Sequence, residues 1–193
     1  MVSWLRIGGG GVIVAVMVLS GCGGDDQVGP TTGTGTVSRS AASASTPTST
    51  TPPSPTPGQV PAAARQHTNA GAEAFVRYYL DELSRAWMTP QTGLLPPLSL
   101  STCKSCRANE EAAAEFVADR EHVDRAVFAA KSVRYREQGD GQTAVVAAGT
   151  QTGLQTLDTS GRVVTSRTAK PLTLVFHLEW AGEGWKVEEV KIG

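Results

Sequence analysis

The chain has 193 residues, with 17 Lys and Arg against 18 Asp and Glu, a net charge of −1, and 40% hydrophobic residues. This near-neutral balance, with no basic stripe, gives no electrostatic basis for nucleic-acid binding, so we expect no nucleic-acid partner. The length suits one domain with residues left over for export and linker segments.

The first segment has the layout of a secretory signal. Arg6 precedes an apolar run at residues 7–19, which is short and Gly-rich for a membrane-spanning helix. The run ends in the letters LSGC, with Cys22 last, and this resembles the bacterial lipobox, Leu-(Ala/Ser/Thr)-(Gly/Ala)-Cys. The resemblance implies a signal peptide at 1–21 and a diacylated Cys22 that anchors the protein in the lipid bilayer. The alternative is an uncleaved anchor helix with an incidental cysteine.

A linker follows the lipobox. Residues 22–67 are mostly Gly, Ser, Thr, Pro and Ala, a composition that buries too little apolar surface to offset the entropy of ordering. We therefore expect a lipidated N-terminus with a disordered linker, whose Thr and Pro density also suits O-glycosylation. The predicted location is the extracytoplasmic face of the cell membrane.

Residues 68–193 have the pattern of one globular domain that opens with a helix, capped by Thr68 or Asn69. The predicted buried face is Ala72, Phe75, Val76, Tyr79, Leu83, Ala86 and Trp87. Charges alternate at i, i+4 on the opposite face, which we interpret as solvated: Glu73, Arg77, Asp81 and Arg85. Because Tyr78 and Tyr79 are adjacent, at most one is expected to face the core. Asp81 is assigned to the charged face rather than to a site.

A second helix is predicted over about 103–122, after the Pro-rich segment "TPQTGLLPPLSLS". Ser101 or Thr102 can cap it. Its expected buried side carries Ala113, Phe116 and Val117.

The period then changes to two, which indicates strands. The strands are expected at about 126–137, 142–157, 162–180 and 184–192, with turns at 139–141, 158–161 and 181–184. In the third strand the Leu/Phe/Trp positions face the core, so His177 and Glu179 face away and are interpreted as a surface pair. A phase change in the last strand predicts a bulge near Glu188 and Glu189.

Helices followed by a meander predict an α+β fold, with two or three N-terminal helices packed on a curved four-stranded antiparallel meander. This order, with an aromatic-rich first helix and the ending "GWKVEEVKI", resembles the SnoaL-like, nuclear-transport-factor-2-like cone. The lipobox, the linker, "AFVRYYLDELSRAW", the Thr92-Gly93 turn and "LSLSTCKSC" together resemble a family of uncharacterised actinobacterial lipoproteins. The resemblance implies a fold and no established activity.

Cys103 and Cys106 form a Cys-x-x-Cys pair. In an exported protein an even pair favours a structural disulfide. Zinc would need two more ligands, and His67, His122 and His177 are scattered along the chain. Thiol–disulfide chemistry remains the rival interpretation, because the pair lies at a predicted helix N-terminus.

No phosphate loop, nucleophile elbow or metal motif occurs in the sequence. We therefore predict an envelope lipoprotein with a non-catalytic accessory or ligand-binding domain and no cofactor. Its expected partners are the bilayer, through acylated Cys22, and an envelope protein or a small apolar ligand. The alternatives are a cone-type enzyme that acts on a small apolar ligand and an extracytoplasmic thiol–disulfide oxidoreductase.

Overall fold

The computed structural model describes residues 58–138 and 142–193. The predictions for the signal peptide, for Cys22, for most of the linker and for the turn at 139–141 lie outside these residues. The helices are η1 (Ala62–Arg65), α1 (Asn69–Met88), η2 (Pro96–Leu98) and α2 (Lys104–Asp119). The strands are β1 (His122–Val123), β2 (Phe128–Glu137), β3 (Thr143–Gln151), β4 (Gln155–Leu157), β5 (Val163–Ser166), β6 (Lys170–Ala181) and β7 (Gly184–Ile192). Within the described residues, no helix is long and apolar enough to cross a bilayer.

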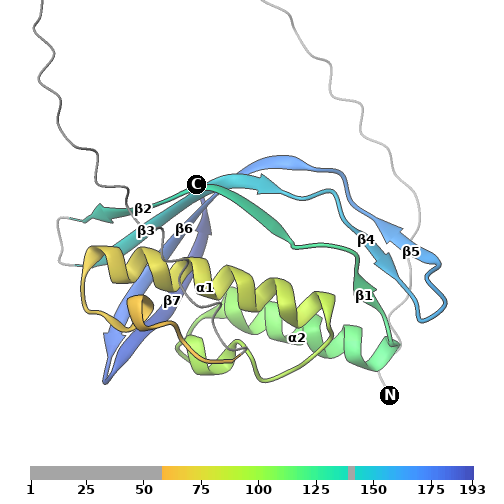
Figure 1. Cartoon of the computed structure of the whole chain (residues 1–193), viewed down its shortest axis with the longest axis horizontal. Helices are drawn as coiled ribbons and strands as arrows, with labels where there is room; N and C mark the ends of the chain where they lie inside the picture. The colour runs from red at the N-terminus through yellow and green to blue at the C-terminus, as the bar shows by residue number, and fades with distance from the viewer. Residues whose placement is uncertain (1–57, 139–141) are drawn as a thin grey trace, which may run out of the picture. The chain divides into compact units, whose positions relative to one another are not determined.

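The strands form two antiparallel sheets, which confirms the α+β prediction. The main sheet has the order β2-β3-β6-β7, and the small sheet has the order β1-β4-β5. Figure 1 shows α1 and α2 side by side below the main sheet, while β4 and β5 extend away from it. The buried side chains of the helices and of the inner sheet face form one core. The four predicted strands are therefore present as the main sheet.

The small sheet was not predicted as a separate unit. The expected strand at 142–157 is interrupted between β3 and β4, and the expected strand at 162–180 is interrupted between β5 and β6. Both interruptions lie where the chain passes between the main sheet and the small sheet. The alternation of side chains continues through each of them, but the strand to which the chain is hydrogen-bonded changes. The bulge predicted in the last strand is present, because His177 pairs with Glu189 while Leu178 pairs with Val187, leaving Glu188 extra.

Helix α1 is buried on more than one side. The Thr68 hydroxyl accepts a hydrogen bond from the Gly71 amide at 3.0 Å, so the predicted cap is confirmed. Both Tyr78 and Tyr79 are buried, at 7% and 1% exposure, so the expectation that only one faces the core was wrong. The physical reason is that α1 packs against α2, β1, β2 and β3, which surround it over a wider arc than one sheet face.

The charged face of α1 does not simply face solvent. One Glu73 carboxylate oxygen accepts a hydrogen bond from the Tyr135 amide at 3.0 Å, and Arg77 donates to the Val133 carbonyl at 3.0 Å. Val133 and Tyr135 lie in β2, an edge strand of the main sheet, so these side chains occupy backbone groups that β3 does not use. The predicted solvated face was correct for Asp81 and Arg77, which are exposed, and wrong for Glu73, which is partly buried.

The opposite edge of the main sheet is also covered. Ser99 forms a parallel bridge with Val187 of β7, and the Leu100 amide donates to the Val187 carbonyl at 2.9 Å. Leu95 and Leu98 anchor this loop in the core, at 0% and 6% exposure. The Pro-rich segment therefore covers the backbone edge of β7.

Packing against the core begins before Thr68, the expected start of the domain. Ala64 of η1 is 1% exposed, and the indole nitrogen of Trp185 donates to the Gln66 carbonyl at 2.9 Å. The His67 ring stacks on Trp180, with ring centroids 4.4 Å apart. Gly71 permits this approach, since a Cβ there would overlap the Gln66 carbonyl.

Helix α2 is shorter than expected. Its N-cap is Cys103 rather than Ser101 or Thr102, and it ends at Arg120 in the left-handed conformation. Ala113 is buried as predicted, whereas Val117 is 47% exposed. The segment after Arg120 turns into β1, where Val123 rejoins the core at 1% exposure.

Candidate functional site

An apolar cavity lies between the two helices and the inner face of the main sheet. Its volume is about 290 Å³. We call it the cone cavity, and its lining comes from α1 (Tyr79, Leu80, Leu83, Trp87), α2 (Ser105, Asn109) and the sheet side (Val127, Phe128, Gln151, Leu172, Leu174, Phe176, Val190, Lys191, Ile192). The size is at the low end of pockets that hold small molecules.

Apolar residues that alternate along β6 form the sheet wall of this cavity. Leu172, Leu174 and Phe176 alternate along β6 on the inner face, as the sequence predicted. Phe128 reaches the cavity from β2 because Gly149 of β3 lies beneath its ring, and a Cβ at Gly149 would overlap that ring and the Ala129 carbonyl. The glycine in an otherwise apolar strand therefore shapes the site.

The polar groups of the cavity lie toward α2 and the rim. Ser105 and Asn109 are one helical turn apart on α2, and Lys191 forms an ion pair with Glu189 at 2.9 Å. Trp87 closes one side, with its indole nitrogen donating to the Asn109 carbonyl at 3.1 Å and its ring packed edge-on against Phe116. A molecule bound here would contact hydrocarbon over most of its surface and hydrogen-bonding groups at one side.

Tyr79 is the most deeply buried ionisable group of the cavity. Desolvation raises the pKa of Tyr79 to about 12, with the Asn109 side chain opposing the shift. The hydroxyl is buried and forms no bond of good hydrogen-bonding geometry. The phenol is therefore neutral at physiological pH.

None of the described residues that line the cone cavity is Asp, Glu or His. General acid–base catalysis most often relies on an imidazole or a carboxylate within hydrogen-bond reach of the reacting atom. His177 and Glu179 lie on the other face of β6, where His177 pairs across the sheet with Glu189. The prediction that they face away from the core is confirmed.

The cysteine pair is buried at the start of α2. The Cys103 and Cys106 sulfur atoms lie 2.00 Å apart, and the two residues are 0% and 2% exposed. Cys103 is the N-cap, and its sulfur accepts a hydrogen bond from the Cys106 amide at 3.2 Å. The bond closes the first turn of α2 and does not itself fasten the preceding loop.

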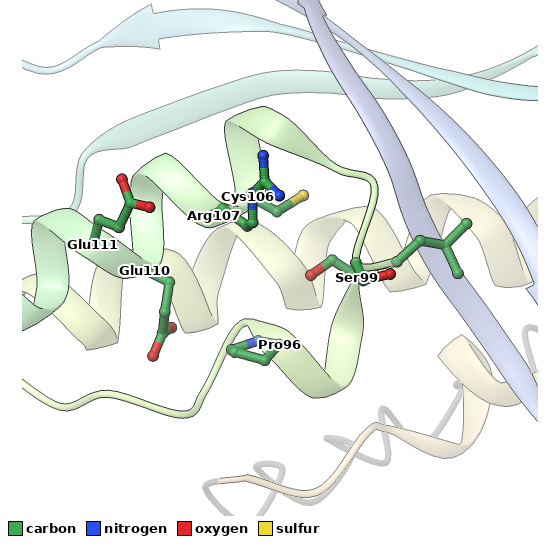
Figure 2. Close-up of a pocket in the computed structure, with 8 residues that line it drawn as sticks. Pro96, Ser99, Cys106, Arg107, Glu110 and Glu111 are labelled. Carbon is green, nitrogen blue, oxygen red and sulfur yellow. The ribbon is translucent and has the colours of Figure 1, made fainter.

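A shallow groove runs beside this pair (Figure 2). It is lined by Pro96, Ser99, Leu100, Ser101, Cys106, Arg107, Glu110 and Glu111. Figure 2 shows Glu110 directed toward the segment before Pro96 and Glu111 directed away from it. One Glu110 carboxylate oxygen accepts a hydrogen bond from the Gly93 amide. Glu110 thus holds the loop in place, and this loop covers the cysteines.

Sequence patterning identified the walls of the cavity but not the cavity itself. The residues that bound it come from six segments separated by up to 113 positions, from Tyr79 to Ile192. The signal that was available, and that we did not use, was the pair of polar residues Ser105 and Asn109 at i, i+4 on a face of α2 that meets the core. The histidines stay apart: His67 is on the Trp180 cluster, His122 is in β1 and His177 is on the outer face of β6.

Solved structures support the fold. The chain is similar to the intermembrane-space region of the chloroplast protein ARC6, with 16% identity, 66% of this chain and 97% of the other covered, and a TM-score of 0.51. Similarity is lower to the protein Aln2 from a Streptomyces species (11% identity, 63% and 89% covered, TM-score 0.43) and to a substituted form of a protein named Rd1NTF2_05 (14% identity, 61% and 96% covered, TM-score 0.34). Of these three structures, ARC6 alone has a TM-score above 0.5, and its similarity supports the fold and nothing further.

Sequence comparison gives a family but no activity. Among curated protein sequences, none matches the chain. A family model matches residues 40–191, which is more than half of the chain. The chain therefore belongs to a family of unknown function, DUF6318.

Proposed function

We propose that this chain is a lipid-anchored protein of the actinobacterial cell envelope whose domain binds a small, mainly apolar molecule in the cone cavity without converting it. The observation that carries the binding role is the cavity itself, with Leu172, Leu174 and Phe176 on one wall and the aromatic Trp87 on another. Apolar pockets with a few convergent polar groups are the usual form of small-molecule sites. The anchor is supported by the lipobox that ends at Cys22.

Two features favour binding over chemistry. The cavity lining offers a neutral phenol and a rim lysine rather than a carboxylate or an imidazole. The Cys103–Cys106 sulfurs are nearly inaccessible, whereas a thiol–disulfide enzyme needs a sulfur that a partner's thiolate can reach. A buried pair fits a structural bridge.

The binding role is tested with a neutral apolar fluorophore, N-phenyl-1-naphthylamine, titrated into the chain. Leu174→Trp should fill the cavity and weaken binding by roughly tenfold or more, since it removes the apolar surface that the probe would contact. Val175→Trp is the matched control, because Val175 is the next residue and is not part of the cavity lining. Equal affinity in both variants would mean that the probe binds elsewhere and that the cavity is not a binding site.

The anchor is tested separately by metabolic labelling with a fatty acid in an actinobacterial host. Cys22→Ser should abolish the label because the thioether carries the lipid, whereas the double change of Cys103 and Cys106 to Ser should keep it. Label retained in Cys22→Ser would rule out the lipobox interpretation.

A further inference from the structure

The two sheets differ in whether their edge strands are covered. The β2 edge is occupied by Glu73 and Arg77, and the β7 edge is bridged by Ser99 and Leu100. Strand β5 is the edge of the small sheet, and none of the described residues pairs with its outer side. An uncovered edge presents backbone amides and carbonyls to any extended chain that approaches it.

Strand β5 also exposes apolar side chains. All four of its residues are exposed, with Val163 at 46% and Val164 at 44%. The β4–β5 register shifts by one residue at Val164, so this residue is left outside the regular ladder. Exposed valines on a free edge are a liability in an isolated protein, and a partner strand would bury them.

The charges at the two ends of β5 bear on whether a second copy of this chain or another protein would pair with its edge. Arg162 precedes the strand and forms an ion pair with Asp158 at 2.9 Å, and Arg167 follows it. Antiparallel pairing of β5 with a second copy, centred between Val164 and Thr165, would place Arg162 opposite Arg167 of that copy. Like charges directly opposite each other destabilise a strand pair. In this register a second copy is therefore disfavoured as the occupant, although Asp158 offsets part of the Arg162 charge.

We propose that the free edge of β5 is a docking site for an extended segment of another protein, with β-branched or aliphatic residues in its middle and a carboxylate near Arg167. The segment would add a fourth strand to the small sheet by backbone hydrogen bonds, the mode of recognition known as β-augmentation. Its middle residues would cover Val163 and Val164. The carboxylate would contact Arg167, for which no ion pair is present among the described residues, and Lys170 lies three residues further on.

The test uses the full chain and three capped peptides. The first is Asp-Val-Thr-Val-Val-Asp, the second has Lys in place of both Asp residues, and the third is the acidic peptide with N-methylated backbone amides. Residue-resolved amide hydrogen exchange at 163–166 is the readout. The acidic peptide should slow exchange there and bind about fivefold more tightly than the basic one, while the N-methylated peptide should have no effect.

Charge reversal sharpens the test. Arg167→Glu should reverse the preference, so that the basic peptide binds more tightly than the acidic one. This residue is exposed and its backbone bond to the Leu154 carbonyl is unaffected, so the fold is retained. Unchanged exchange at 163–166 with every peptide would overturn the proposal. Protection at 163–166 that rises with protein concentration alone would overturn it in favour of a second copy.

Discussion

The main sheet and the small sheet belong to one chain but differ in how their surfaces are used. In the main sheet, Val133, Val145 and Phe176 are at most 2% exposed under the helices, and both edges are covered. In the small sheet, Thr156 and the neighbouring Leu154 are buried, while every residue of β5 is exposed. The first sheet therefore supplies the stability and the cavity, and the second supplies an accessible edge.

The difference separates the part of the chain that is buried in the core from the part that remains accessible to solvent. Burial of apolar area is the main favourable term in folding, so the strands under α1 and α2 determine the free energy of unfolding. A strand that buries little contributes little, and its exposed valines need another explanation than stability. The comparison predicts that truncation of a side chain to alanine has very unequal effects in the two sheets.

The largest expected effect is in the main sheet. Phe176 is 1% exposed and packs edge-on against Tyr79, with ring centroids 5.8 Å apart. Phe176→Ala should lower the free energy of unfolding by about 3–5 kcal/mol, because it removes buried area and leaves a cavity. Val164→Ala in β5 should change it by no more than about 0.5 kcal/mol. Urea denaturation measures both, and comparable losses would break the comparison between the sheets.

The second prediction concerns the start of the packed chain. A chain that begins at residue 68 lacks the buried Ala64 and the Gln66 carbonyl to which the Trp185 indole donates. It should be about 2 kcal/mol less stable than a chain that begins at residue 58, from the lost burial and an indole N–H left without its partner. The chain beginning at 58 should match one that begins at 22. Equal stability of the 58 and 68 chains would show that these contacts contribute nothing.

The sequence was sufficient to predict the features that depend on a local pattern of residues. The inner face of β6, the cap at Thr68 and the bulge at Glu188 were all predicted, because each depends on residues close together in the chain. The small sheet was missed, because a period of two is the same whether the neighbouring strand belongs to one sheet or another. Edge covering by Glu73 and Arg77 was missed for a related reason: their partners lie 62 and 56 residues away.

The candidate site was less predictable than the fold. Its apolar wall follows from alternation in β6, but its volume depends on how far α2 lies from that wall. That distance is set by the loop of residues 89–103, where Glu110 holds Gly93 and Leu100 pairs with Val187. The burial of both Tyr78 and Tyr79 likewise depends on the number of elements around α1, which helical periodicity does not report.

The third prediction concerns the cysteines. Replacing both Cys103 and Cys106 with Ser should lower the free energy of unfolding by about 2 kcal/mol and leave a folded protein, since the loop they close is very short. Serine is itself a good N-cap, so the change at Cys103 preserves the start of the helix.

Redox measurements extend this prediction. A buried structural bridge should have a reduction potential below about −300 mV and no insulin-reductase activity. Turnover in that assay, with a potential between about −120 and −270 mV, would instead assign thiol–disulfide chemistry to the pair.

The smallest effect concerns the cover of the β2 edge, and it depends on pH. The hydrogen bond from the Tyr135 amide is the main cause that lowers the pKa of Glu73 below its usual value of 4.5, with Arg77 and Arg134 adding to it. Because the folded-state pKa is the lower one, the charge contributes stability above the unfolded-state pKa, and this contribution is lost as the pH falls through the folded-state pKa.

Glu73→Gln keeps an acceptor for Tyr135 but removes the charge. At pH 7 it should cost about 1 kcal/mol, a charged hydrogen bond discounted for the partly exposed ion pairs. Below the folded-state pKa of Glu73 the two proteins should be nearly equal in urea denaturation, as linkage requires. A difference that persists unchanged at low pH would mean that the shape of the side chain, rather than its charge, covers the edge.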